Sequence, residues 1–144
     1  MTTETADVTV VVATRNRREQ LLATLPRHAA AVIVADNGSD DGGPDAVEAA
    51  LPHVRVLRLG ENRAAAARTA GARLATTPFV AFADDDSWWE PGSLREAARL
   101  LHAHPRAALL AARVLVGERG EEDPVSAAMA AAPLGTPAGA PGPA

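Results

Sequence analysis

Three consecutive aspartates, Asp84, Asp85 and Asp86, carry the strongest chemical signal in the sequence. Two unit charges about 4 Å apart repel by roughly 4 kcal/mol at a surface-like dielectric, so such a triplet favours a neutralising partner. In extended geometry Asp84 and Asp86 point to one side and Asp85 to the other. Two carboxylates on one side suit a hard divalent cation that also takes phosphate oxygens and can neutralise a leaving diphosphate. The alternative is a solvated acidic turn, with Asp86 or Ser87 capping the turn that follows.

The residues around this triplet favour a binding site over a solvated turn. The apolar run at 79–83 leads directly into the aspartates, and Trp88, Trp89 and Pro91 follow them. Acidic residues at a strand end beside aromatic rings indicate a site, because the rings can stack on a sugar or a nucleotide. The same two tryptophans could instead cover the sheet edge as part of the core, and both interpretations are open at this point.

The hydrophobic pattern predicts the elements that must position these residues. Short apolar runs predict strands, and longer segments with apolar residues at helical spacing predict helices. The expected strands are 8–12, 31–35, 54–59, 79–83 and 107–116, and the expected helices are 17–25, 44–51, 64–75 and a segment that opens at 91–93. Strands that alternate with helices indicate an α/β fold with a mostly parallel sheet and helices on both faces.

Ligands of open parallel sheets bind beyond the carboxyl ends of the strands. The informative polar residues of this sequence lie at those positions, namely 14–17, 36–41, Asn62 and 84–86. Because several strand ends agree, the set supports a binding site more strongly than the aspartate triplet does alone. Asp41 is expected to cap the helix that starts near Pro44 rather than to contact a ligand.

Composition and charge exclude several classes of function. The chain has 144 residues, a formal net charge of −4 and no basic run, which argues against a nucleic-acid partner. Because there is no cysteine, disulfides, thiolate metal sites and a thiol nucleophile are excluded. The first residues are polar and acidic, and no apolar run reaches the length of a membrane span, so we expect a cytoplasmic protein. The histidines are expected on the surface; they are His28, His53, His102 and His104.

A single domain is expected over residues 7–117, after a disordered N-terminus at 1–6. Beyond 117 the alternation of elements decays. Residues 118–123 are charged, and residues 133–144 are rich in Pro, Gly and Ala. This composition predicts a disordered tail over 118–144.

Four blocks of the sequence together resemble the glycosyltransferases of family 2. They are VTVVVATRNR at 8–17, VIVADNGSDD at 32–41, ENRAAAARTAG at 61–71 and FVAFADDD at 79–86, the last of which contains a DxD motif. The blocks come in the family's order, and the resemblance covers about residues 7–115. It implies a GT-A (Rossmann-like) fold that is incomplete at its C-terminus. It also implies a nucleotide-diphosphate sugar donor, a divalent metal (Mg or Mn) and inversion at the anomeric carbon.

The resemblance further implies roles for individual residues. Asp36 would accept hydrogen bonds from the base or the ribose, and Asp86 would coordinate the metal directly. Asp84 would meet the ribose or the metal shell, and Asp85 would be either a helper or a spacer. The other residues implied in binding the nucleotide-sugar are Thr14, Arg17, Asn62 and Arg68, the last of which would face the nucleotide or its phosphates.

Two departures from the family pattern bear on the site. Ala64 stands where Gly is frequent, which crowds the turn without removing a ligand. Family members place the catalytic base and most acceptor contacts well downstream of the DxD motif, where this chain becomes rich in Pro, Gly and Ala. No catalytic residue is therefore assigned, since Glu121, Glu122 and Asp123 lie too near the motif.

Three hypotheses of different classes remain open. The chain is a glycosyltransferase for an unknown acceptor, with its acceptor half supplied by a second chain; a noncatalytic nucleotide-sugar-binding module; or a nonfunctional remnant of a longer gene. Two other classes, the sugar-nucleotide pyrophosphorylases and the dinucleotide oxidoreductases, fit the sequence less well. Both need a glycine-rich loop after the first strand, where this chain has Ala-Thr-Arg-Asn-Arg.

Overall fold

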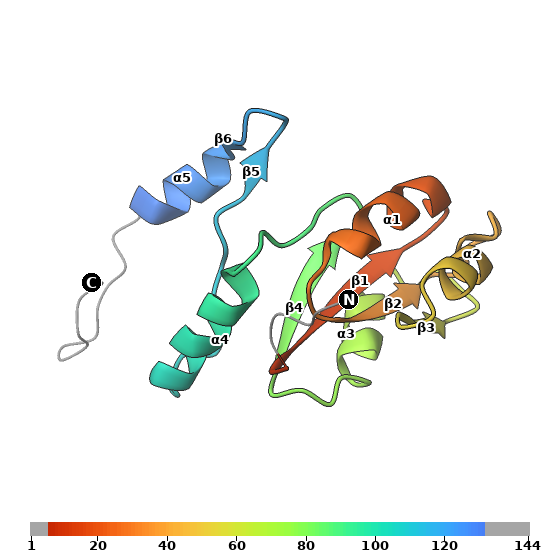
Figure 1. Ribbon diagram of the computed structural model, residues 1–144, viewed down its shortest axis with the longest axis horizontal. Coiled ribbons are helices and arrows are strands. Elements are labelled where there is room, and N and C mark those ends of the chain that lie inside the picture. The colour runs from red at the N-terminus through yellow and green to blue at the C-terminus, as the bar shows by residue number, and fades with distance from the viewer. Residues whose placement is uncertain (1–5, 132–144) are drawn as a thin grey trace. The chain divides into compact units, whose positions relative to one another are not determined.

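A parallel β-sheet of four strands forms the framework of residues 6–107 in the computed structural model, which describes residues 6–131. The strands are β1 (Val8–Thr14), β2 (Ala31–Asp36), β3 (Arg55–Arg58) and β4 (Phe79–Asp84), in the order β3-β2-β1-β4 (Figure 1). Every pairing between them is parallel. The predicted α/β fold with a mostly parallel sheet is therefore confirmed.

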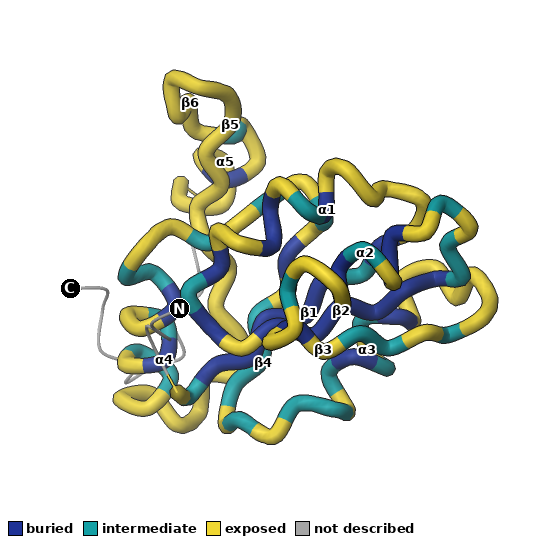
Figure 2. The backbone as a smooth tube through the Cα atoms, turned by 45° about the vertical axis from the view of Figure 1, so that its right-hand side comes forward, coloured by how far each residue is buried: buried dark blue, intermediate teal, exposed yellow. Residues whose placement is uncertain are grey.

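The two inner strands, β1 and β2, are apolar on both faces. Val10 and Val11 are both 0% exposed although neighbouring side chains on a strand point to opposite faces. A β-branched run without alternating polar residues is typical of a strand covered on both sides. Figure 2 shows β1 and β2 as largely buried. On the edge strand β4, by contrast, Phe82 is 48% exposed.

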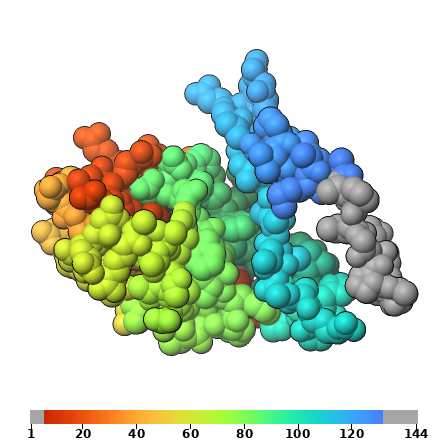
Figure 3. Space-filling model, turned by 180° about the vertical axis from the view of Figure 1, so that it is seen from behind, coloured from red at the N-terminus to blue at the C-terminus, as the bar shows by residue number. Residues whose placement is uncertain are grey.

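Helices cover both faces of this sheet. They are α1 (Arg18–Thr24), the short 3-10 helix η1 (Leu25–Arg27), α2 (Gly43–Ala50), α3 (Ala66–Ala72) and α4 (Ser93–Ala103). Leu21 of α1, Val47 of α2 and Leu94 of α4 share one core cluster with Val10 of β1. Helix α3 lies on the other face, where it contacts β1 and β2 (yellow-green in Figure 3). The sheet therefore lies between two helical layers, as predicted.

Helix α3 can approach β1 closely only because residue 71 has no side chain. A Cβ atom at Gly71 would lie 2.6 Å from Cγ1 of Val11, well inside the closest approach of two carbon atoms. The predicted helix over 64–75 is also shorter than expected and begins at Ala66. Ala64 has a φ of 47°, which is left-handed backbone and cannot belong to a right-handed helix.

Several strands run slightly further than the apolar pattern predicts. Thr14, Asp36 and Asp84 are the last residues of β1, β2 and β4. In the parallel register Thr14 pairs with Asp36, and Ala13 pairs with Asp84. Three of the predicted site residues are thus fixed at one edge of the sheet by the strand ladders themselves.

The second compact unit, residues 108–131 of the described chain, differs from the sequence-based expectation. It contains a two-residue antiparallel ladder between β5 (Leu115–Val116) and β6 (Glu121–Glu122), followed by α5 (Pro124–Ala131). The predicted strand over 107–116 is wrong, because only its last two residues find a ladder partner; Leu109 is 74% exposed. Within the predicted tail, Asp123 accepts a hydrogen bond from the Ser126 amide and thereby caps α5.

The compact units divide after Ala107, whereas the sequence led us to expect a domain boundary after residue 117. The rest of the predicted tail, 132–144, and residues 1–5 of the predicted disordered N-terminus lie outside the described residues. No helix in the described part of the chain is both long and apolar enough to cross a membrane.

One histidine contradicts the expectation of four surface histidines. His28 lies between η1 and β2 and is 1% exposed, whereas His53, His102 and His104 are exposed as predicted. Neither ring nitrogen of His28 has a hydrogen-bond partner within the described residues. Burial lowers the pKa of His28, so the ring is held in its neutral form. The prediction followed the usual exposure of histidine, which does not hold at this position between η1 and β2.

Candidate functional site

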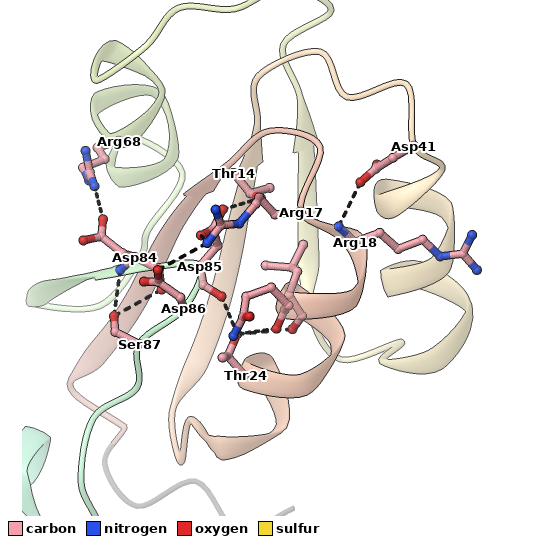
Figure 4. Close-up of polar contacts among 12 residues, drawn as sticks. Thr14, Arg17, Arg18, Thr24, Asp41, Arg68, Asp84, Asp85, Asp86 and Ser87 are labelled. Atoms are coloured by element: carbon pink, nitrogen blue, oxygen red, sulfur yellow. Dashed lines mark hydrogen bonds and ion pairs between the residues drawn. The ribbon is translucent and has the colours of Figure 1, made fainter. Parts of the chain in front are cut away.

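The acidic triplet begins with the last residue of β4, Asp84, and the chain bends directly after it. The Ser87 amide donates to the Asp84 carbonyl at 3.2 Å, and the Asp84 amide donates to Oγ of Ser87 at 3.0 Å, which closes a turn over residues 84–87 (Figure 4). Extended geometry therefore ends at Asp84. Asp84 and Asp86 have different partners on either side of this turn: Asp84 pairs with Arg68 of α3, while Asp86 pairs with Arg17.

The middle aspartate, Asp85, ties the acidic loop to the first strand and helix. Its Oδ2 accepts a hydrogen bond from Oγ1 of Thr14 at 2.9 Å, and its backbone carbonyl accepts one from Oγ1 of Thr24 at 2.8 Å. The Asp85 side chain is only 16% exposed. Asp85 therefore holds the acidic loop against β1 and α1.

Two guanidinium groups neutralise much of the charge in this loop. Nη2 of Arg17 lies 3.3 Å from Oδ2 of Asp86 and 3.6 Å from Oδ1 of Asp85, while Arg68 pairs with Asp84. Guanidinium groups stay charged at any physiological pH and match the geometry of carboxylates and phosphates. The arginines thus bring permanent positive charge to the place where the sequence predicts an anionic diphosphate.

Asp36 lies at the end of the neighbouring strand β2 and is 3% exposed. Its Oδ2 accepts hydrogen bonds from the amides of Gly38 and Ser39 at 3.2 and 3.1 Å. Its Oδ1 is buried and has no hydrogen-bond partner in the described part of the chain. Leaving a buried carboxylate oxygen unpaired is costly, so this atom can accept a hydrogen bond from a bound group.

The turn over residues 62–64 is organised by two asparagines. Oδ1 of Asn62 accepts the Ala64 amide at 2.9 Å, so this predicted ligand residue shapes its own turn. Asn37 fastens the turn to the end of β2, because its Oδ1 accepts the Arg63 amide at 3.0 Å and its Nδ2 donates to the Ala64 carbonyl at 3.3 Å. The sequence reasoning did not single out Asn37, although it follows the β2 aspartate directly.

A second missed residue, Asn16, joins the loop after β1 to the loop after β2. It adopts a φ of 53°, which asparagine tolerates better than most residues. Its amide donates to Oγ of Ser39, and its Oδ1 accepts the Asp40 amide, both at 2.9 Å. Asp41, which was expected to cap the helix near Pro44, lies one residue before the N-cap position, which Gly42 occupies. Its Oδ1 still accepts the amide of Gly43, the first residue of α2.

The Asp41 carboxylate also accepts the amide of Arg18, at the start of α1, through its Oδ2. One side chain therefore joins the first residues of two helices. A shallow depression of about 540 Å³ lies here, lined by residues 16–20 and Asp41. The loops after β1 and β2 thus form one hydrogen-bonded rim beside the acidic loop.

The two tryptophans have different surroundings. The guanidinium carbon of Arg27 lies 3.4 Å from the ring centroid of Trp88, a cation–π contact, and Trp88 is 38% exposed. Trp89 packs against the core cluster, so the core interpretation holds for this residue. Trp88 keeps an exposed ring beside the acidic loop.

The residues of the loop fit a divalent cation in part. Among the described residues no group of three carboxylates or imidazoles converges on one point. Mg²⁺ is usually held by one or two carboxylates together with substrate phosphates and water, rather than by a cage of protein ligands. The exposed carboxylates of Asp84 and Asp86, which are 65% and 56% exposed, fit that kind of site.

A four-stranded parallel sheet with a layer of helices on each face and an acidic loop at its carboxyl edge places this chain in the GT-A fold class. The chain belongs to glycosyl transferase family 2, whose family model matches residues 9–136. No curated protein matches the chain in sequence.

Solved glycosyltransferase structures share this fold. TarS 1-349 from S. aureus in complex with UDP-GlcNAc is 23% identical, with a TM-score of 0.60 over 69% of this chain and 32% of that chain. The mannosyltransferase PcManGT from Pyrobaculum calidifontis, in complex with GDP-Man and Mn²⁺, is 27% identical, with a TM-score of 0.58 over 66% of this chain and 32% of that chain. This chain thus spans about a third of the length of these structures.

Proposed function

We propose that this chain binds a nucleotide-diphosphate sugar at the carboxyl edge of its sheet and forms the donor half of an inverting, metal-dependent glycosyltransferase. The observation that carries the proposal is the convergence of Thr14, Asp36 and Asp84 at the ends of three neighbouring strands. Arg17 and Arg68 lie among the carboxylates of the adjoining loop. We propose inversion at the anomeric carbon on the basis of membership of family 2.

The end of β2 is the place we propose for the nucleoside. The unpaired Oδ1 of Asp36 needs a donor, and the N–H of a base or the hydroxyl of a ribose can supply one. The turn over residues 62–64, which Asn37 fastens to β2, borders this strand end. We propose that Thr14 and Asn62 complete the pocket, Thr14 as the residue that fixes the Asp85 carboxylate.

The acidic loop is the place we propose for the diphosphate. Asp86 and Asp84 would hold a divalent cation, Mg²⁺ or Mn²⁺, which when bound stabilises the negative charge of the leaving diphosphate. Arg68, whose side chain is 37% exposed, holds Asp84 in place from α3 and can reach a phosphate oxygen on the same side. A related mannosyltransferase structure contains GDP-Man with Mn²⁺, which supports this combination of ligands.

A noncatalytic nucleotide-sugar-binding module is the second candidate, and one observation favours it. Two acidic residues beyond the DxD motif already have partners in the second unit: Glu121 pairs with Arg119, and Asp123 caps α5. No described residue is therefore assigned as the catalytic base. If the base and the acceptor site come from a second chain, sugar transfer requires both partners, whereas donor binding requires this chain alone.

Calorimetric titration of UDP, GDP and dTDP, each with and without Mn²⁺, tests the proposal. We expect saturable binding of one nucleotide that requires the metal, and its loss by at least tenfold in Asp86→Ala, since a charged ligand to a metal is removed. The matched control is Asp45→Ala, because Asp45 is an exposed aspartate of α2 that pairs with Arg58 away from the loop. Absence of nucleotide binding by the folded wild-type chain, or equal loss in both variants, would refute the proposal.

A further inference from the structure

Arg17 pairs with the carboxylate of Asp86, the residue that we propose as a metal ligand. Its Nη2 is 3.3 Å from Oδ2 of Asp86 and 3.6 Å from Oδ1 of Asp85, so one end of the guanidinium group contacts both carboxylates. These are long, single-atom contacts rather than the two parallel hydrogen bonds that an arginine can make with a carboxylate. The Arg17 side chain is 49% exposed. The guanidinium group is therefore held mainly by charge attraction, and it can move away from the two carboxylates.

The surroundings of Arg17 show what else it can reach. Asp85 is already bound by Thr14 and held through its carbonyl by Thr24, so the loop keeps its position without Arg17. Arg17 itself immediately precedes α1, on the rim of the depression lined by residues 16–20 and Asp41. Its Nε and Nη1 donate no hydrogen bond within the described chain and are available to a phosphate oxygen.

We propose that Arg17 is a mobile counter-cation of this site. Without donor it neutralises Asp86, and when a divalent cation occupies that carboxylate with the nucleotide, Arg17 moves to the diphosphate. The physical reason is that a permanently charged guanidinium group and a divalent cation repel each other at this separation, whereas the guanidinium group and a phosphate attract and fit in two-point contact. The proposal rests on the proposed function, and it makes Arg17 a binding residue that couples the affinity for the metal to the affinity for the donor.

The proposal predicts effects of opposite sign in one variant. In Arg17→Gln the competing cation is absent, so we expect Mn²⁺ alone to bind roughly tenfold more tightly than to the wild type. In the same variant the nucleotide diphosphate, titrated at saturating Mn²⁺, is expected to bind about tenfold more weakly because a charge-assisted contact is lost. A residue with only a structural role would weaken both affinities together.

Electron paramagnetic resonance of free Mn²⁺ measures the first affinity, and calorimetry with UDP, GDP and dTDP measures the second. Arg18→Gln is the matched control, because Arg18 is the neighbouring arginine and forms no ion pair with the aspartates of the loop among the described residues. Arg17→Lys keeps the charge but loses the two-point contact, so its affinity for Mn²⁺ should stay near that of the wild type while nucleotide affinity falls. Circular dichroism confirms that each variant is folded.

The outcomes separate this inference from the proposed function. If the wild type binds a nucleotide with Mn²⁺ but Arg17→Gln behaves like Arg18→Gln, or loses both affinities, the role of Arg17 is refuted and the donor site stands. If neither the wild type nor any variant binds Mn²⁺ or a nucleotide, the donor site itself is refuted and the role of Arg17 with it. Tighter Mn²⁺ binding with weaker nucleotide binding in Arg17→Gln alone supports the proposal.

Discussion

Ala64 holds a backbone conformation that suits glycine better than alanine, which makes Ala64→Gly a direct test of the turn beside the site. Its φ is 47°, and left-handed backbone costs an L-residue roughly 1–2 kcal/mol. Glycine loses about 0.4–1 kcal/mol more conformational entropy than alanine on folding. Ala64 is exposed, and the bonds that it makes to Asn37 and Asn62 use its backbone, so the substitution removes no contact of the methyl group with the core.

The difference between these terms predicts that Ala64→Gly stabilises the fold by about 0.5–1 kcal/mol, which raises the melting temperature by about 2–8 °C for a domain of this size. Thermal denaturation followed by circular dichroism measures the shift. The adjacent substitution Ala65→Gly is the control, because Ala65 is also exposed but has a right-handed φ of −62°. We expect it to destabilise the fold by about 0.4–1 kcal/mol, because glycine has more conformational entropy than alanine in the unfolded chain and relieves no strain at this φ. Equal destabilisation by the two variants would show that the conformation of Ala64 is not strained.

Two further predictions concern the core. Gly71→Ala should destabilise the fold by about 1–3 kcal/mol in urea denaturation, because its Cβ would lie 2.6 Å from Cγ1 of Val11. A urea denaturation curve unchanged from that of the wild type would contradict the close packing of α3 on β1. Burial lowers the pKa of His28 in the fold, so on acidification the unfolded chain binds a proton before the folded chain does. The free energy of unfolding should therefore fall as the pH drops below about 6.5, by at most about 1.4 kcal/mol per pH unit. His28→Leu should remove this dependence, and parallel stability curves for the two proteins between pH 7 and pH 5 would refute it.

The sequence predicted the sheet correctly because the residue pattern of each inner strand indicates whether that strand is buried on both faces. The β-branched run of β1 and the apolar run of β2 could only be strands covered on both faces, and the polar residues that ended them had to lie at one edge. Thr14, Asp36 and Asp84 are therefore brought together as expected. The prediction of a strand over 107–116 was wrong, because apolar composition does not show whether a neighbouring strand is available for pairing.

The contacts within the site could not be predicted in this way. Arg17 and Asp86 are 69 residues apart in sequence, and they meet because β1 and β4 are neighbours in the sheet. Strand order is a property of the whole fold, which periodicity in one segment does not encode. The sequence left open whether the aspartates stay extended or enter a turn. In the structure residues 84–87 form a turn, and Asp84 and Asp86 pair with arginines from different segments, Arg68 and Arg17.

The turn gives the three aspartates of the triplet unequal environments. Asp85 is 16% exposed and satisfied by threonines of β1 and α1, so its charge is used to hold the loop against the sheet. Asp84 and Asp86 are more than half exposed, and each has one arginine as its partner. A loop fixed at its middle residue and charged at both neighbours keeps two carboxylates in place while leaving each free to exchange its partner. An exposed ion pair contributes only about 0–1 kcal/mol to stability, so replacing either arginine by another partner costs the fold little. The pairings with Arg17 and Arg68 are therefore compatible with a site that binds a cation and a diphosphate together.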